Sequence, residues 1–289
     1  MTERVGFVGL GVMGGPMSQN MSKTFPVLGF DAQASRLSAA AGISKARSAA
    51  EVGKTCSVVF LSLPSAAVVE EVVLGPGGLG EALHRGSLLV DLSTSLPSVS
   101  RRIAERLASR EVAFADAPVS GGEGGARSAT LAIMVGAAPE VFDRARPYLA
   151  TIGKTVVRVG DVGAGGIAKL VNNMIVASTF AVIAEGMALA TANGVDVTRL
   201  YDAIREGWAG SKVLDVSAPA IAARQYTPGG TVDMMQKDLS YARMLAAETQ
   251  SPIPMTAAAH EVFVAGQAAG YGKNAQPAVY ELWKRQGGA

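Results

Sequence analysis

Three closely spaced glycines follow the first apolar run of the chain and constrain its fold most strongly. The run Val5–Val8 has the composition of a buried strand, and the next nine residues read GLGVMGGPM, with glycines in the spacing G-x-G-x-x-G. The first glycine permits a tight turn, the second lets the backbone approach a pyrophosphate, and the third lets the next helix pack closely. This pattern predicts a dinucleotide-binding unit. The residues expected to contact the cofactor are Gly9, Leu10, Gly11, Val12, Met13 and Gly14.

An acidic residue ends the second predicted strand, Val27–Asp31. Asp31 lies 20 residues beyond Gly11, where a carboxylate accepts hydrogen bonds from the ribose hydroxyls of the adenosine. The same carboxylate would repel the 2′-phosphate of NADP. NAD is therefore predicted as the preferred cofactor, with NADP as the alternative. A second interpretation makes Asp31 a cap or turn aspartate.

Strand-like and helix-like segments alternate up to residue 162. Further strands are predicted at Ser57–Leu63, Ser87–Asp91, Val112–Asp116, Leu131–Val135 and Thr155–Val159. Helical segments separate these strands. The alternation predicts an α/β Rossmann-type fold with a doubly wound, mostly parallel sheet, which binds its ligands at the carboxyl ends of the strands.

The strand patterns stop at residue 163. The stretch Gly163–Gly194 is apolar, opens on glycines and closes on Asn193-Gly194, which predicts one helix about 40 Å long with a left-handed cap. The helical patterns after it are Asp196–Glu206, Ser211–Ala222, Val232–Thr249, Met255–Ala269 and Pro277–Arg285. We therefore predict a dinucleotide-binding domain, 1–162, and an all-helical domain for substrate binding and oligomerisation, 163–289, joined by the long helix 163–194.

The long helix carries three polar residues close to its start. Asn172 and Asn173 lie three and four residues after Lys169, so the three side chains share one helical face. A solvated helix end would also tolerate them. A membrane span is disfavoured, because the asparagines and Glu185 interrupt the apolar run before it reaches 18 residues. No membrane partner is expected, and the amine and the two amides become candidate site residues.

The composition argues against several other functions. The 26 Lys and Arg residues nearly balance the 24 Asp and Glu residues, and no basic stripe marks a nucleic-acid surface. Cys56 is the single cysteine, and the two histidines, His84 and His260, are far apart in sequence. Neither a metal site nor a Ser-His-Asp triad is therefore predicted. No targeting segment is recognisable before the first strand, which predicts a cytoplasmic location.

Four sequence blocks carry a resemblance that covers nearly the whole chain. They are GLGVMGGPM at 9–17, DAPVSGG at 116–122, GIAKLVNN at 166–173 and KDL at 237–239. In this order and spacing the chain resembles the β-hydroxyacid dehydrogenase family, which includes 3-hydroxyisobutyrate dehydrogenase and tartronate semialdehyde reductase. The resemblance implies that Lys169 is the catalytic lysine. The substrate-binding residues that it implies are Ser120, Gly121, Gly122, Asn172 and Asn173, and the further cofactor-binding residues are Leu63, Pro64, Thr94 and Lys237.

The chemistry of hydride transfer fits these residues. The cofactor supplies the hydride step, so the protein has to hold the substrate and manage one proton. Lys169 would take this proton in oxidation and return it in reduction, which requires its pKa to fall from about 10.4 toward roughly 7–8. The hydroxyl of Ser120 and the unhindered N–H groups of the glycines after it suit a substrate carboxylate. The other interpretation of residues 120–125 is a flexible loop.

Two positions differ from those of relatives, and a third has two interpretations. Val176 stands where 6-phosphogluconate dehydrogenases have an acid seven residues after the lysine, which argues against decarboxylation of a phosphosugar. Ala129 follows the DAPVSGG block at a position that is usually glycine. Trp208 precedes a helix of the second domain, where it either shapes the substrate pocket or belongs to the core.

The predicted function is that of an NAD(P)-dependent oxidoreductase that reversibly oxidises a small 3-hydroxy acid to its semialdehyde or oxo acid. Two alternatives stay open. Imine reductases share this architecture but usually have an aspartate or tyrosine in place of Lys169, and a non-catalytic dinucleotide-binding protein would keep the fold without the reaction. The largely apolar long helix further predicts a homodimer or homotetramer.

Overall fold

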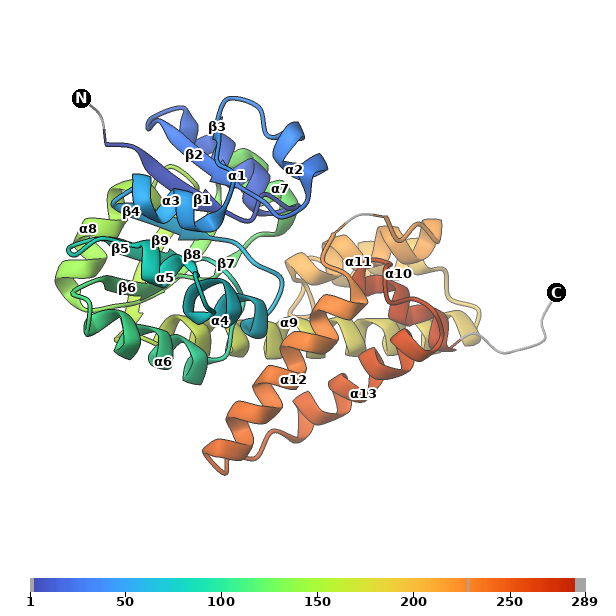
Figure 1. The fold of residues 1–289 in the computed structure, drawn as a ribbon. Coiled ribbons are helices and arrows are strands. Elements are labelled where there is room, and N and C mark those ends of the chain that lie inside the picture. The colour runs from blue at the N-terminus through green and yellow to red at the C-terminus, as the bar shows by residue number, and fades with distance from the viewer. Residues whose placement is uncertain (1–2, 228, 284–289) are drawn as a thin grey trace. The chain divides into compact units, whose positions relative to one another are not determined.

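The computed structural model of the chain describes residues 3–227 and 229–283. The chain divides into two compact units, Met1–Lys169 and Leu170–Ala289 (Figure 1). This division falls inside the long helix, whereas the predicted domain boundary lies at the start of that helix. The boundary at residue 163 stays a prediction.

One sheet forms the centre of the first unit. Its strands are β1 (Val5–Val8), β2 (Val27–Phe30), β3 (Ser44–Lys45), β4 (Val58–Leu61), β5 (Leu88–Asp91), β6 (Ala113–Asp116), β7 (Val119–Ser120), β8 (Leu131–Gly136) and β9 (Gly153–Gly160). The order β3-β2-β1-β4-β5-β6 is parallel throughout, which is the arrangement of a doubly wound dinucleotide-binding sheet. Strand β8 pairs antiparallel with β6 and β7 and parallel with β9. The predicted Rossmann-type fold class is confirmed.

Helices connect the strands of the first unit. They are α1 (Gly14–Ser22), α2 (Ala34–Ala39), α3 (Ala49–Thr55), α4 (Ala66–Leu74), α5 (Leu79–Ala82), α6 (Pro97–Ala108), α7 (Gly122–Ser128) and α8 (Pro139–Leu149). The strands β1, β4 and β5 are buried at every position, as expected for parallel strands covered on both faces. Fully buried Phe7, Phe60 and Leu88 contribute to the core that the sheet and helices share.

Four short elements of the first unit escape prediction from the sequence. Strands β3 and β7 have two residues each, too few for a period of two to be recognised. Helix α5 has four residues, and α7 has three glycines among its seven. Helix α7 ends at Ser128, and its C-cap residue Ala129 has a φ of 56°, in the left-handed region that favours glycine, so a glycine would be less strained at this position.

Helices make up the described part of the second unit. Helix α9 (Ala164–Ala192) begins in the first unit and is followed by α10 (Val197–Ile204), α11 (Lys212–Ala223), α12 (Val232–Glu248), α13 (Pro254–Ala268) and η1 (Gln276–Trp283). The core of the unit includes the buried side chains of Leu214, Leu239 and Phe263. Gly194, after α9, has a φ of +79°, which is the left-handed cap that the sequence predicts.

One prediction about the second unit is wrong, and one of two alternatives is excluded. The segment predicted as the last helix forms the 3₁₀ helix η1, because apolar residues three positions apart suit both helix types. Residues 284 and 285 of that prediction lie outside the described residues. Trp208, between α10 and α11, is fully exposed, so it is not a core aromatic residue.

Helix α9 has an apolar face that its own unit leaves uncovered. Val171, Ile175, Val182 and Leu189 are exposed, and their spacings of four and seven residues place them along one side of the helix. By length and composition, α9 is the one helix among the described residues that is long and apolar enough to cross a membrane, and 22% of its most apolar window is buried. The expectation of no membrane partner stays a prediction.

Candidate active site

The turn between β1 and α1 has almost no room for side chains. A Cβ atom on Gly9 would lie 2.2 Å from the carbonyl oxygen of Ser62, and one on Gly14 would lie 1.8 Å from that of Gly9. Gly9 also has a φ of +94°. At Gly11, by contrast, the nearest atoms belong to the Arg36 guanidinium, 3.5 Å from the position of a Cβ atom. The turn therefore packs tightly against its neighbours and stays open at Gly11, as close approach of a pyrophosphate requires.

Asp31 holds this turn in place. Asp31 is 8% exposed, and its Oδ2 atom accepts a hydrogen bond from the Leu10 N–H at 2.7 Å. Its Oδ1 atom accepts another from the Gln33 N–H at 2.8 Å, as a turn aspartate would. Each carboxylate oxygen can accept a second hydrogen bond. The geometry is therefore compatible with both interpretations of Asp31 made from the sequence.

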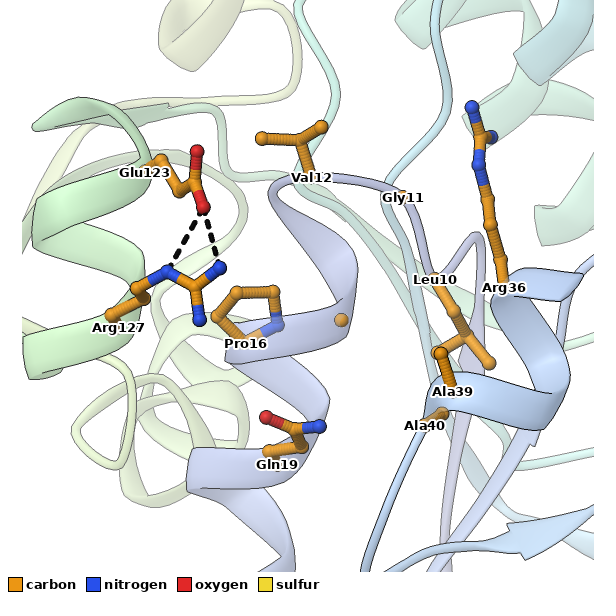
Figure 2. A pocket seen from close by; sticks show the side chains of 11 residues that line it. Leu10, Gly11, Val12, Pro16, Gln19, Arg36, Ala39, Ala40, Glu123 and Arg127 are labelled. Carbon is orange, nitrogen blue, oxygen red and sulfur yellow. Dashed lines mark hydrogen bonds and ion pairs between the residues drawn. The ribbon is translucent and has the colours of Figure 1, made fainter. Parts of the chain in front are cut away.

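A cavity of about 380 Å³ lies over the N-terminal part of α1, between α2 and α7 (Figure 2). Arg36 comes from α2 on one side and Arg127 from α7 on the other, and Arg127 is paired with Glu123 at 2.6 Å. Guanidinium groups and a helix N-terminus favour phosphate, so these residues fit the adenosine and phosphate parts of a dinucleotide. The cavity is lined by Leu10, Gly11, Val12, Gly15, Pro16, Gln19, Arg36, Ala39, Ala40, Glu123 and Arg127.

Arg36 is a site residue that sequence reasoning missed. Its Nη1 atom lies 4.0 Å from Oδ2 of Asp31, and its side chain is half exposed over Gly11. The signal in the sequence is a cation five residues after the acid that ends β2. An arginine in this neighbourhood of a Rossmann sheet accommodates a 2′-phosphate, so the prediction of NAD from Asp31 alone leaves out a group of opposite charge.

The loops after β4 and β5 are tied together by hydrogen bonds. The Leu63 N–H donates to Oγ of Ser93 at 2.8 Å, and the Ser93 N–H donates to Oδ1 of Asp91 at 2.9 Å. Asp91 is 1% exposed, and burial raises its pKa to about 7, opposed by the Ser93 hydrogen bonds and reinforced by the Asp116 carboxylate. The predicted cofactor residues Leu63, Pro64 and Thr94 lie in these loops. Asp91, which accepts the hydrogen bond from Ser93, was not predicted.

The DAPVSGG block forms the end of β6, strand β7 and the start of α7. Ser120 pairs with Ala132 of β8, and Gly121 and Gly122 follow it with φ values of +135° and +61°. Both glycines are exposed. Asn20 of α1 donates from Nδ2 to the carbonyl oxygen of Ala126 at 2.7 Å and so ties α7 to α1. The block therefore forms a turn with two exposed glycines at the place where the sequence predicts carboxylate binding.

Within the second unit, Asp238 of the KDL block contacts the asparagines that end the GIAKLVNN block. Asn173 is 5% exposed and donates from Nδ2 to Oδ2 of Asp238 at 2.7 Å. Its Oδ1 atom accepts from Nδ2 of Asn172 at 2.9 Å. The Nζ atom of Lys237 lies 2.9 Å from Oδ1 of Asp238 and 5.0 Å from the centre of the Tyr241 ring. The two roles predicted for Asn173 stay open, and the contact of Asp238 with Asn173 was not predicted from the sequence.

Lys169 is the last residue of the first unit and is half buried on α9. It lies one helical turn after Gly165 and Gly166, close to the point where α9 leaves the sheet. The predicted proton-transfer residue and the predicted dinucleotide turn therefore belong to the same unit.

Comparison with known proteins identifies the family. Residues 4–160 match the model of the NAD-binding domain of 6-phosphogluconate dehydrogenase, and residues 163–283 match the model of the NAD-binding domain of NADP-dependent 3-hydroxyisobutyrate dehydrogenase. The chain is 35% identical to 2-(hydroxymethyl)glutarate dehydrogenase of Eubacterium barkeri, over 99% of this chain and 96% of that protein. The chain belongs to the β-hydroxyacid dehydrogenase family.

Two further relatives support membership of the β-hydroxyacid dehydrogenase family. The chain is 37% identical to 3-hydroxyisobutyrate dehydrogenase of Pseudomonas aeruginosa, over 90% of each chain. Its fold matches the structure of Mycobacterium tuberculosis 3-hydroxyisobutyrate dehydrogenase with L-serine, with a TM-score of 0.90, 32% identity and coverage of 99% and 100%. As a β-hydroxyacid dehydrogenase, the chain is an NAD(P)-dependent oxidoreductase that acts on hydroxy acids.

Metal binding is not indicated by the described residues of this β-hydroxyacid dehydrogenase. Among residues 3–227 and 229–283, no group of three or more His, Cys, Asp or Glu side chains is arranged to hold a metal ion. The absence of a metal stays a prediction.

We expect Asp91→Asn to remove a pH dependence of stability. Because the pKa of Asp91 is about 7 in the folded chain and about 3.8 when unfolded, the folded state holds an extra proton between these values. Stability therefore falls as pH rises through this window, by on the order of 1 kcal/mol per pH unit from this group. Urea unfolding of the two proteins from pH 5 to pH 7 measures the difference. Parallel stability curves for wild type and variant would contradict the assignment.

Proposed function

We propose that this protein reversibly oxidises a small 3-hydroxy acid to its semialdehyde or oxo acid, with Lys169 as the general acid and base. One observation carries the proposal: the dinucleotide turn after β1, the Ser120–Gly122 turn after β6 and the start of α9 all lie at the carboxyl edge of one sheet. That edge is where a sheet of this type binds its ligands.

The residues divide the chemistry among them. A bound nicotinamide dinucleotide accepts or supplies the hydride. Ser120 Oγ and the N–H groups of Gly121 and Gly122 bind the substrate carboxylate and so fix the carbon that reacts. Lys169 takes the hydroxyl proton when the alcohol is oxidised and returns it to the carbonyl oxygen when the product is reduced. Asn172 and Asn173, on the same helix, orient the lysine or bind substrate hydroxyls.

The names of the relatives narrow the substrate class. L-serine, 3-hydroxyisobutyrate and 2-(hydroxymethyl)glutarate, which those names print, share a primary hydroxyl on the carbon next to the one that bears a carboxylate. We propose this unit, a 3-hydroxy acid with a primary alcohol, as the substrate of the present chain.

NAD is the proposed preferred cofactor and NADP the alternative. Asp31 accepts hydrogen bonds from ribose hydroxyls and repels a 2′-phosphate. Arg36 opposes this preference, because its guanidinium lies 4.0 Å from the Asp31 carboxylate, on the edge of the same cavity. The proposal is therefore that Asp31 sets the preference for NAD and that Arg36 provides the remaining use of NADP.

The exposed side of α9 is proposed as a surface between subunits. Four apolar side chains along one helix, three of them more than 60% exposed, make a stripe that water solvates poorly. Association of copies of the chain through this stripe as a dimer or tetramer would bury it. Sedimentation velocity of the full chain measures the assembly, and a monomer at micromolar concentration would contradict the proposal.

Lys169→Ala tests the proposed catalytic residue. We expect kcat to fall by about 10²–10⁴-fold, because the proton loses its acceptor, while the dissociation constant for NAD changes little. Initial rates with 3-hydroxyisobutyrate and fluorescence titration with NAD provide the two measurements. Turnover at the wild-type rate would rule out the role of Lys169.

The two alternatives predict different results for the unmodified chain. Reduction of a cyclic imine with NADPH, together with no turnover of hydroxy acids, would favour an imine reductase. Tight cofactor binding without turnover of any hydroxy acid would favour a non-catalytic protein. Lys169 itself argues against both, because the first class usually has another residue there and the second has no need of it.

Arg36→Ala tests the basis of the cofactor preference. Removing the guanidinium should lower kcat/KM with NADP and leave kcat/KM with NAD nearly unchanged. The ratio of kcat/KM with NAD to kcat/KM with NADP should therefore rise by on the order of 10-fold. Arg127→Ala is the matched control, because it removes a guanidinium from the opposite side of the same cavity and should affect both cofactors alike. An unchanged ratio in Arg36→Ala would contradict the assignment.

A further inference from the structure

The start of α9 is bound by a buried carboxylate. Asp116, the last residue of β6, is 2% exposed, and its Oδ1 atom accepts a hydrogen bond from the Gly163 N–H at 2.7 Å. Its Oδ2 atom accepts another from the Gly166 N–H, also at 2.7 Å. The first N–H groups of a helix have no partner within the helix. Asp116 supplies these partners from a strand about 50 residues earlier in the chain. In many helices the side chain of the N-cap residue has this role.

Glycines let the same helix end rest directly on the sheet. A Cβ atom on Gly165 would lie 2.5 Å from the carbonyl oxygen of Met134 and 2.6 Å from that of Asp116. A Cβ atom on Gly136, which pairs with Asp116 in the sheet, would lie 2.4 Å from Oδ1 of Asp116 and 2.7 Å from the Gly165 nitrogen. The backbone of α9 is therefore in contact with strands β6 and β8, and the hydrogen bonds to Asp116 also fix its rotation.

Lys169 lies one helical turn after the contact between the start of α9 and the sheet. It lies four residues after Gly165 and three after Gly166, so it shares the helical face that meets Asp116. Side chains on a helix tilt toward its N-terminus, which directs the lysine stem back toward the sheet. A rotation of the first turn of α9 would therefore move the Lys169 amine by a similar angle.

The hydrogen bonds at the start of α9 require a carboxylate and not simply any polar side chain. Two N–H donors point at Asp116, and a carboxylate has an acceptor oxygen for each of them. An asparagine would offer one oxygen and turn its own N–H₂ group toward the other donor. Burial raises the pKa of Asp116 above its ordinary value, and the hydrogen bonds from Gly163 and Gly166 and the Arg101 guanidinium oppose this rise without cancelling it. The donors and the cation thus favour the ionised form that the geometry requires.

We infer that Asp116 is a positioning residue for the reaction: it fixes the first turn of α9 and through it the Lys169 amine. The inference rests on the proposed role of Lys169. It adds a second function to the DAPVSGG block, whose serine and glycines are assigned to the substrate and whose aspartate acts on the proton-transfer residue without touching the substrate.

A double-mutant cycle with Lys169 tests the inference. We expect Asp116→Asn to lower kcat by on the order of 10- to 100-fold, because small displacements of a reacting group are costly, with the NAD dissociation constant within about twofold of wild type. In Lys169→Ala, rescued by ethylamine in solution, adding Asp116→Asn should have no further effect on the rescued rate, since the free amine is not attached to α9.

The possible outcomes distinguish the positioning role of Asp116 from the proposed catalytic role of Lys169. Should Asp116→Asn lower the ethylamine-rescued rate by the same factor as it lowers the wild-type rate, Asp116 acts independently of Lys169 and the inference is wrong. An Asp116→Asn protein with normal kcat is equally contrary to it. Full turnover by Lys169→Ala without amine would instead overturn the proposed function. Asp161→Asn is the control, because this exposed carboxylate sits just before α9 and bonds to Arg158, and it should leave the rates unchanged.

A second variant covers the case in which Asp116→Asn does not fold, as judged by its circular dichroism and thermal unfolding. Gly165→Ala places a methyl group 2.5 Å from the Met134 carbonyl oxygen and must displace the helix start, while every charge remains. We expect the same loss of kcat with little change in NAD binding. A folded Gly165→Ala protein with wild-type kcat would overturn the inference.

Discussion

The hydrogen bonds between the Asp116 carboxylate and the N–H groups of Gly163 and Gly166 connect the sheet to the long helix. They join the carboxyl edge of the sheet, where the dinucleotide turn lies, to the helix that carries Lys169. Without this junction the two parts of the proposed chemistry, hydride transfer at the sheet edge and proton transfer from the helix, would have no fixed geometry. The glycines at 136 and 165 make the same contact possible sterically, because their hydrogens leave the backbones free to touch.

Buried aspartates repeat this arrangement along the sheet. Asp31 follows β2 and binds the Leu10 N–H of the glycine turn, Asp91 ends β5 and binds the Ser93 N–H, and Asp116 ends β6. Each carboxylate is less than 10% exposed and each accepts from a backbone group of a loop at the ligand-binding edge. For Asp91 and Asp116, burial raises the pKa and the N–H donors oppose that rise. The loops at the carboxyl ends of the strands are thus held by hydrogen bonds from backbone N–H groups to buried carboxyl groups.

The sequence predicts the fold well because its signals are local. The glycine spacing, the apolar strands and the helical patterns after residue 163 each fall within a short window, and the family blocks locate Lys169, Ser120 and the dinucleotide turn. Contacts between distant segments have no such signal: Asp116 meets Gly166 and Asp238 meets Asn173 across 50 and 65 residues. The exposure of Trp208 and the 3₁₀ form of η1 also depend on tertiary packing, so local patterns predicted them wrongly or left them open.

The most direct test of the account compares each 3-hydroxy acid with a form of it that lacks the carboxylate charge. Initial rates of NAD and NADP reduction would be measured with 3-hydroxyisobutyrate, L-serine and 2-(hydroxymethyl)glutarate, and with the methyl ester of 3-hydroxyisobutyrate. The account predicts turnover of at least one of the free acids and a far lower kcat/KM for the ester than for 3-hydroxyisobutyrate, because the Ser120–Gly122 turn binds a carboxylate. No turnover of any free acid, or equal turnover of the ester and its acid, would contradict it.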